Sequence, residues 1–154
     1  DGQGGTDTAT FASYGAAIDA DLQTLTVTDA NTDIVTLTSI ETLVATGFDD
    51  TIRSGQVIVN TTINGGGGTD TIDFTQLQAA LTLNLSTGTA SIGLGQSYTL
   101  QNIENAVGGG LADSLTGSAG DNTISGGAGD DQLFGSNGTD TLDGNGGFNY
   151  YSLN

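Results

Sequence analysis

Side chains with carboxylate or amide oxygens recur every nine residues in the C-terminal third of this chain, each preceded by glycines. Four nine-residue blocks run without a gap from Gly117 to Ser152: GSAGDNTIS, GGAGDDQLF, GSNGTDTLD and GNGGFNYYS. Each fits all or part of the template G-G-x-G-x-D-x-U-x, in which U is a large apolar residue. The glycines permit positive φ and let backbone carbonyls approach each other, and position six adds a side-chain oxygen. An all-oxygen ligand set of this kind suits calcium.

The spacing of the blocks also predicts the elements that position these oxygens. The last three residues of each nonad alternate, so that one apolar side chain points inward from a very short strand. Eighteen residues then form one coil with two strands and two turns. We expect an all-β fold, a right-handed parallel β-roll or β-solenoid, in which turns two nonads apart share an ion. By that rule Asp113, Asp131 and Asn149 line one edge, and Asn122 and Asp140 line the other.

We call the six turn residues of a nonad a cup. The candidate metal ligands are the residues at the sixth cup position, namely Asp7, Asp50, Asp70, Asp113, Asn122, Asp131 and Asp140. The candidate cup glycines are Gly65, Gly66, Gly68, Gly108, Gly117, Gly120, Gly126, Gly127, Gly129, Gly135 and Gly138. Asn122 and Asn149 keep an oxygen but lose the charge, and cup glycines are missing at Ala45-Thr46 and at Leu111. Those cups should be weaker or vacant.

The charge balance requires cations. One basic residue, Arg53, faces 18 acids and gives a net charge of −17, so the compact chain repels itself unless cations enter. A nonad buries little apolar surface and orders many glycines, so we expect metal binding to supply folding free energy for several calcium ions. Calcium at extracellular concentrations suits such cups, and the expected location is extracellular, at the cell surface.

Missing residue types exclude several functions. The chain has no Cys, His or Lys, which leaves no disulfide, no imidazole or thiolate metal site, no Ser-His-Asp triad and no Ser-Lys dyad. We expect no enzyme activity. The acidic surface argues against nucleic-acid binding, and no apolar run is long enough to span a membrane. Because the chain begins at Asp1 without an initiator Met, we expect a segment of a longer chain or a processed product.

A longer repeat organises the rest of the chain. A shift of 63 residues, or seven nonads, places residues 5–11 (GTDTATF) on 68–74 (GTDTIDF) and Ile40-Glu41 on Ile103-Glu104. We therefore expect one solenoid domain over residues 1–154, made of two units (about 5–67 and 68–130) and C-terminal nonads 131–154.

Each unit also contains a stretch without cups. Leu81, Leu83 and Leu85, and then Ala90, Ile92 and Leu94 after a turn at residues 86–88, alternate as strands do. We interpret these stretches as wider coils of the solenoid. Two alternatives stay open: an unrelated β-subdomain between two rolls, or a helical turn marked by Phe11, Tyr14 and Ile18 and by their equivalents Phe74, Leu77 and Leu81.

The nonads and the flanking pattern F-x-x-L-x-A-A-L-T-L-N-L…L-x-x-I-E-N…D-S-L-x-G resemble the RTX, or hemolysin-type calcium-binding, repeat family of bacterial proteins exported by type I secretion. This resemblance implies a calcium-loaded β-roll. Its members include adhesins, S-layer proteins, proteases, lipases and toxins, in which the activity normally lies outside the roll. Carried over residue by residue, the acid position falls on Asp7, Asp70, Asp113, Asp131 and Asp140.

Other charged residues have simpler interpretations. Glu41 and Glu104 could suggest a paired-carboxylate hydrolase, but each lies in its own repeat, which favours a structural bond to a neighbouring turn. Asp19, Asp21, Asp29 and Asp33 fall outside cups, where solvated charges are the expectation. Arg53 is expected to neutralise local acids, with a binding role as the alternative.

The preferred function is a structural or adhesive surface module. We expect a calcium-stabilised rod that assembles head to tail into a filament or surface layer, because solenoid ends expose strand edges. An apolar C-terminal cluster, Phe148, Tyr150, Tyr151 and Leu153, would be buried by such a contact. Expected partners are its own copies and a cell-surface polysaccharide or another surface protein. The main alternative is a calcium-triggered folding and secretion module of an exported enzyme or toxin. A minor one is ice binding, suggested by Thr6/Thr8/Thr10 and Thr24/Thr26/Thr28.

Overall fold

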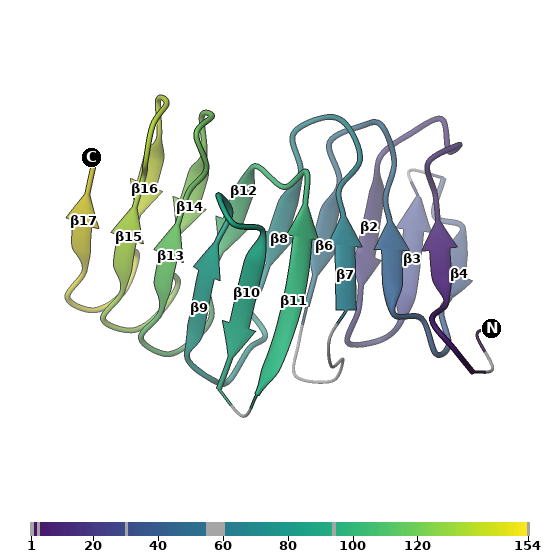
Figure 1. The fold of residues 1–154 in the computed structure, drawn as a ribbon, viewed down its shortest axis with the longest axis horizontal. Helices are drawn as coiled ribbons and strands as arrows, with labels where there is room; N and C mark the ends of the chain where they lie inside the picture. Colours follow the sequence, from purple (N-terminus) through teal and green to yellow (C-terminus); the bar gives the residue numbers. More distant parts are fainter. Residues whose placement is uncertain (1, 3, 30, 55–60, 94, 154) are drawn as a thin grey trace.

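The computed structural model of the chain describes residues 2, 4–29, 31–54, 61–93 and 95–153, and these form two facing β-sheets (Figure 1). Sheet A contains, in spatial order, β1 (Thr8–Thr10), β5 (Thr42–Val44), β7 (Thr61–Asn64), β11 (Gln96–Gln101), β10 (Thr89–Ile92), β9 (Leu81–Asn84), β13 (Ser114–Thr116), β15 (Gln132–Phe134) and β17 (Tyr150–Ser152). Sheet B contains, in spatial order, β16 (Thr141–Asp143), β14 (Thr123–Ser125), β12 (Asn105–Val107), β8 (Thr71–Asp73), β6 (Thr51–Arg53), β2 (Ile18–Asp21), β3 (Thr26–Asp29) and β4 (Ile34–Thr36). The two ends of the chain lie at opposite ends of the long axis.

The nonads form the coils that their spacing predicts. Leu115 pairs with Leu133 in sheet A, and Ile124 pairs with Leu142 in sheet B, in both cases in parallel and eighteen residues apart. The middle residue of these three-residue strands points between the sheets, and Leu115, Ile124 and Leu133 are fully buried. Stacking one apolar side chain per nonad therefore builds a continuous core along the roll.

The stretches without cups differ from the expected wide coils. The strands β9, β10 and β11 form an antiparallel meander within sheet A, and the strands β2, β3 and β4 form the equivalent meander within sheet B. After β9 the chain reverses in the turn at residues 85–88, where Gly88 has φ of 65°, and it returns beside β9 instead of crossing to the other sheet. The predicted alternation at Leu81, Leu83, Ala90 and Ile92 is confirmed, whereas Leu94 lies outside the described residues.

The helical alternative is wrong for both units. The Tyr14 N–H donates to the Phe11 carbonyl, and the Leu77 N–H donates to the Phe74 carbonyl, both at 2.8 Å. Each bond closes a single turn, after which Ile18 and Leu81 begin strands. Phe11, Phe74 and Leu77 still belong to the buried core. In the second unit the spacing thus reflects three inward side chains around a turn, whereas in the first unit Tyr14 is 38% exposed.

Equivalent strands of the two 63-residue units lie in opposite sheets. The strands β1 to β6 correspond by position to β8 to β13, and each has moved to the other sheet. Because each meander stays within one sheet, the chain changes sheet five times between β1 and β8, and this odd number explains why a shift of 63 residues changes the sheet. As a result, one meander lengthens sheet B and the other lengthens sheet A, which keeps the two sheets similar in length.

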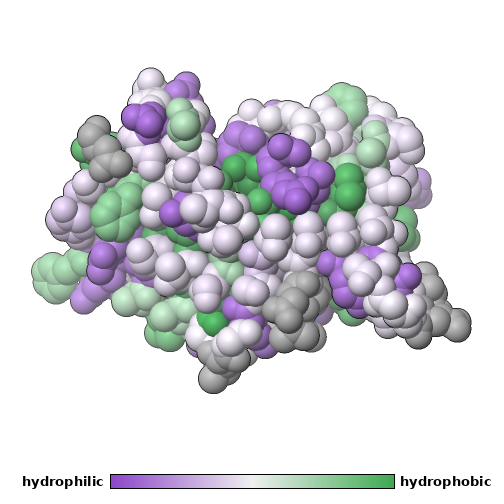
Figure 2. Space-filling view, viewed as in Figure 1, coloured by the Kyte–Doolittle hydropathy of each residue, from purple (hydrophilic) through white to green (hydrophobic). Residues whose placement is uncertain are grey.

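The outer faces of the two sheets differ in charge. In the described strands, the outward positions of sheet A hold no charged residue; they are mostly Thr, Ser, Asn and Gln. Figure 2 shows this face, with pale residues of weak hydropathy over most of its centre. Sheet B carries Asp19, Asp21, Arg53, Asp73 and Asp143 on its outer face. None of the described segments is a helix long and apolar enough to cross a membrane.

Candidate calcium-binding turns

The sixth cup positions are linked in ladders along both edges of the roll. The backbone N–H of each member donates to the side chain of the corresponding residue in the next coil. The Asp113 N–H donates to Asp131 Oδ1 at 2.9 Å, and the Asp131 N–H donates to Asn149 Oδ1 at 2.8 Å. On the other side the Asn122 N–H donates to Asp140 Oδ1 at 3.0 Å. The assignment of these residues to two edges, predicted from the nonad spacing, agrees with this geometry.

We call the edge whose turns lead into sheet A edge A, and the other edge B. Edge A carries Asp7, Asp113, Asp131 and Asn149 with the glycines Gly108, Gly126, Gly127 and Gly129. Edge B carries Asp50, Asp70, Asn122 and Asp140 with the glycines Gly65, Gly66, Gly68, Gly117, Gly120, Gly135 and Gly138. The structure therefore brings candidate ligands from successive coils together in pairs. The two edges lie at opposite ends of the strands.

The ladders contain carboxylates in which one buried oxygen has no hydrogen-bond partner. Asp70 and Asp131 are at most 1% exposed, and Oδ2 of each has no hydrogen-bond partner; the same is true of Asp7 Oδ2. Burial raises the pKa of Asp70 to about 6, and the neighbouring Asp50 and Glu104 carboxylates add to the effect. Burial also raises the pKa of Asp113 and Asp131. Buried, mutually repelling carboxylates with a free oxygen are a site for a cation.

Backbone oxygens complete the donor set. A Cβ at Gly127, where φ is 94°, would overlap the Gly109 carbonyl oxygen of the preceding coil. Only glycine therefore allows successive cups to stack at this distance. Leu111 replaces a glycine in the same edge, yet its backbone lies directly against Gly129 and its side chain is about half exposed. The turn survives this substitution, and a weaker ion site there stays a prediction.

The residues present fit calcium. No group of three or more acidic side chains converges anywhere in the described ranges. Instead, each pair of stacked cups offers one side-chain oxygen donor per turn, such as Asp113 and Asp131, together with carbonyls that face the same space. Hard oxygen donors with few charges are what calcium takes in extracellular modules. A bound ion would neutralise the paired carboxylates and tie adjacent coils together.

The cup that begins at Ala45-Thr46 satisfies its own acid. The Thr46 hydroxyl donates to the Asp50 carboxylate at 2.9 Å, and the Thr46 and Ile18 N–H groups donate to it at 2.7 Å. Asp50 is therefore buried with its oxygens partnered, unlike Asp70 beside it. A glycine at position 46 could not supply the hydroxyl donor, and the weaker ion binding expected of this cup stays a prediction.

Sequence reasoning did not place the two glutamates in the ladders. Asp7 N–H donates to Glu41 Oε2 and Asp70 N–H donates to Glu104 Oε2, both at 2.9 Å. The turns before Glu41 and Glu104 are shorter than a cup, and the longer side chain spans the difference. The predicted structural bond to a neighbouring turn is confirmed. The signal was available in the repeat itself, because both glutamates directly precede a strand, as cup acids do.

The remaining charged residues have local structural roles. Arg53 pairs with Asp19 and lies 3.7 Å from Asp73 Oδ2 on the outer face of sheet B, which raises the pKa of its guanidinium. The Asp21 carboxylate accepts the N–H groups of Gln23 and Thr24, and Asp29 accepts those of Asn31 and Asp33. Asp19, Asp21 and Asp29 thus brace strands and turns, which is more specific than the solvated charges that were expected.

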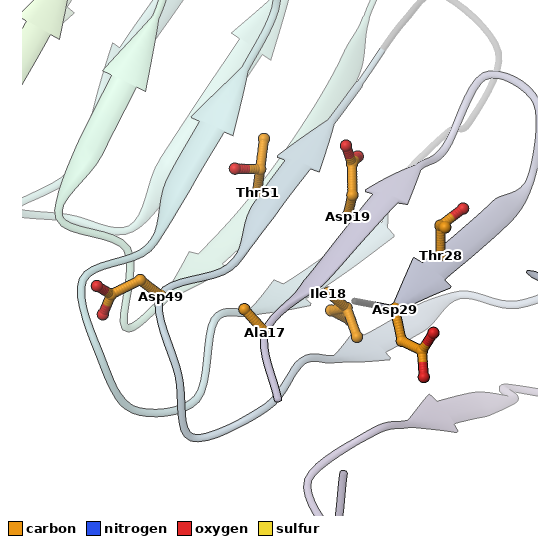
Figure 3. Close-up of a pocket in the computed structure, with 7 residues that line it drawn as sticks. All are labelled: Ala17, Ile18, Asp19, Thr28, Asp29, Asp49 and Thr51. Carbon is orange, nitrogen blue, oxygen red and sulfur yellow. The ribbon is translucent and has the colours of Figure 1, made fainter. Parts of the chain in front are cut away.

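An open pocket of about 460 Å³ lies between the meander of sheet B and the turn after β5. Figure 3 shows that the side chains of its lining residues Asp19, Asp29 and Asp49 point in different directions. Each already has a partner: Asp19 pairs with Arg53, Asp29 caps its own turn, and Asp49 accepts the Thr69 N–H at 2.8 Å. The pocket therefore offers no converging ligands.

Stacked glycine cups on a two-sheet, mainly parallel roll define a calcium-binding β-roll. Residues 60–75, 107–142 and 116–151 match the RTX calcium-binding nonapeptide repeat, in 4 copies. The chain thus carries repeats of the RTX family, and the resemblance, the β-roll fold and the calcium-binding character predicted from the nonads are confirmed. A search of the curated proteins finds no match to the chain.

Proposed function

We propose that this chain is an extracellular, non-catalytic structural module whose calcium-loaded roll forms a stiff segment of a filament, surface layer or adhesin. The observation that carries the proposal is the ladder of stacked acids, in which Asp70 and Asp131 are buried with one oxygen unpartnered. Calcium between these acids would lock each coil to the next. RTX repeats typify secreted proteins, which supports an extracellular location.

Head-to-tail self-association is the second part of the proposal. The inward-facing Tyr151 is 48% exposed because no further coil covers it, and Leu153 and Phe148 are 70% and 91% exposed. Another copy stacked on this end would bury these residues and extend the strand ladder. The partners of such a module would be its own copies and, on the lateral faces, a cell-surface polysaccharide or another surface protein.

The experiment is light scattering and electron microscopy of the purified chain with millimolar calcium and with chelator. We expect long particles with calcium and none without it, and Tyr151→Asp should abolish them while the circular dichroism stays the same. A calcium-loaded chain that stays monomeric over a wide concentration range would favour the alternative, a calcium-triggered folding and secretion module of an exported enzyme or toxin.

Ice binding is a further candidate, favoured by one observation. Thr8, Thr42, Thr62, Thr99 and Thr89 stand in register across neighbouring strands of sheet A, about 4.8 Å apart. The runs that first suggested this function lie on opposite sheets, however, with Thr8 and Thr10 in sheet A and Thr26 and Thr28 in sheet B. Uptake of the calcium-loaded protein into growing ice, and its loss in Thr62→Lys, would support this function; exclusion from ice would eliminate it.

A further inference from the structure

Edge A carries complementary groups at the two ends of the roll. Asp7 donates its N–H to Glu41, but within the part of the chain that the structure describes no amide donates to the Asp7 carboxylate, and its Oδ2 is buried without a partner. At the far end Asn149 accepts the Asp131 N–H, while its own backbone N–H has no partner among the described residues. At one end of the roll the Asp7 carboxylate therefore lacks a donor, and at the other end the Asn149 N–H lacks an acceptor.

The turns that carry these two residues share a sequence pattern. Residues 1–10 read DGQGGTDTAT, and residues 143–152 read DGNGGFNYYS. Both have glycines at the same three positions, an amide side chain between the first two, and an oxygen-bearing side chain at the sixth cup position. Within the chain, a cup of this pattern stacks directly on another cup, as the cup ending at Asn149 does on the cup ending at Asp131.

The strands that follow the two turns have matching polarity. The strands β1 and β17 form the two outer edges of sheet A, and β10 is the one strand of that sheet that runs against its neighbours. Hence β17 of one copy can pair in parallel with β1 of the next. In the register that β15 and β17 use, Tyr151 then faces Ala9, a small inward residue that leaves room for the ring.

Edge B offers no such match. Its ladder starts with the Ile18 N–H, which donates to Asp50, and an isoleucine side chain has no oxygen to accept a bond from another copy. The contact is therefore restricted to edge A and sheet A, and it has one direction only.

We propose that the turn ending at Asn149 in one copy and the turn ending at Asp7 in the next form a calcium-binding cup between the two chains. The Asn149 N–H donates to the Asp7 carboxylate, the stacked turns supply carbonyl oxygens, and Tyr151 packs on Ala9. Calcium is the ligand because the contact joins two chains of charge −17 around a buried, unpartnered carboxylate oxygen. This site rests on the head-to-tail assembly proposed above.

The test uses two variants that each damage one end, Asp7→Ala and Tyr151→Asp, in sedimentation velocity runs with millimolar calcium. Each variant alone should sediment as a monomer. A 1:1 mixture should give dimers and nothing larger, because one intact head meets one intact tail; chelator should dissociate them. Circular dichroism of each variant checks that the roll has formed, and Asp33→Ala, an exposed acid outside the cups, should assemble as the unaltered chain does.

A second pair of variants tests the strand edge without touching the cups. The N–H of Thr10 in β1 and that of Thr36 in β4 both point away from the neighbouring strand, since Phe11 and Leu37 make the bonds to Val44 and Leu25. Thr10→Pro should block assembly and Thr36→Pro should not.

The outcomes separate the two proposals. A folded, calcium-loaded chain that stays monomeric overturns the assembly and this site together. If the chain assembles but Asp7→Ala and Thr10→Pro assemble equally well, the assembly stands and the site between the chains is wrong. The same conclusion follows if the mixture of folded variants yields no dimer.

Discussion

The Asp50 N–H donates to Asp70 Oδ1 at 2.7 Å, so one acid at a sixth cup position holds the next in place one coil further along. Both residues are buried, and the bond fixes the Asp70 carboxylate against its neighbour's backbone while leaving Oδ2 unpartnered. The same relationship recurs between Asp113 and Asp131 on the opposite edge. Folding of the roll therefore concentrates like charges that the chain itself does not neutralise.

Folding should depend on calcium. Without ions, the buried carboxylates repel each other and the glycine turns have little to order them, so circular dichroism should show a mostly disordered chain. Millimolar calcium should convert it to a β-rich spectrum, and excess chelator should reverse the change. A spectrum that is fully β-rich without calcium would contradict this prediction.

Asp131→Ala should destabilise the calcium-loaded protein far more than Asp33→Ala. The first change removes a buried carboxylate that accepts the Asp113 N–H, and it should lower the free energy of unfolding by about 2 kcal/mol or more. The second removes an exposed carboxylate and should change it by less than about 0.5 kcal/mol. Calcium titrations followed by circular dichroism measure both effects, and equal midpoints would refute the nonad register.

Acid should stabilise the calcium-free roll. The pKa of Asp70 is about 6 in the folded chain, above its value in the unfolded chain, so the folded state holds this proton more tightly. The resulting stabilisation is complete below the unfolded pKa and is lost as pH rises through about 6. Metal-depleted protein should therefore be more folded at pH 4.5 than at pH 7.5.

Calcium and protons should compete for the same group, so the calcium concentration that half-saturates the folded roll should increase as pH falls below 6. Asp70→Asn imitates the protonated side chain, and it should flatten the pH dependence of the metal-free protein. An unchanged dependence in that variant would show that other groups dominate.

Gly127→Ala should be costly and Gly47→Ala should not. At Gly127 the positive φ and the adjacent Gly109 carbonyl both oppose a Cβ, whereas a Cβ at Gly47 meets nothing within 4 Å. We expect a loss of about 1 to 3 kcal/mol of unfolding free energy for the first change and less than about 0.5 kcal/mol for the second. Thermal unfolding in calcium compares the two directly.

Glu104→Ala should separate a structural acid from the cup acids. It removes the acceptor of the Asp70 N–H, which should cost about 1 to 2 kcal/mol, and Glu104→Gln should retain most of the stability because an amide oxygen still accepts the bond. If Glu104→Gln is as damaging as Glu104→Ala, the charge of Glu104 matters more than its bond.

The sequence by itself determined the parts of this protein that repeat with a fixed short period. Nine-residue spacing places Leu115, Ile124 and Leu133 inside the roll and assigns Asp131 and Asp140 to opposite edges, because each nonad is one strand and one turn and leaves little freedom in between. The calcium chemistry followed from the same spacing, since glycine and an acid are needed at fixed positions of each turn.

Tertiary structure alone decided what depends on residues far apart in the chain. The Asp7 bond to Glu41 and the Asp70 bond to Glu104 each join residues 34 positions apart, and no local spacing encodes that distance. The same holds for the meander strands β3 and β10. The alternation of apolar and polar residues predicted that strands form there, but the direction of each strand and the sheet to which it belongs depend on the strand it pairs with. The bond from the Ile18 N–H to Asp50 Oδ1 is of the same kind, since 32 positions separate its partners.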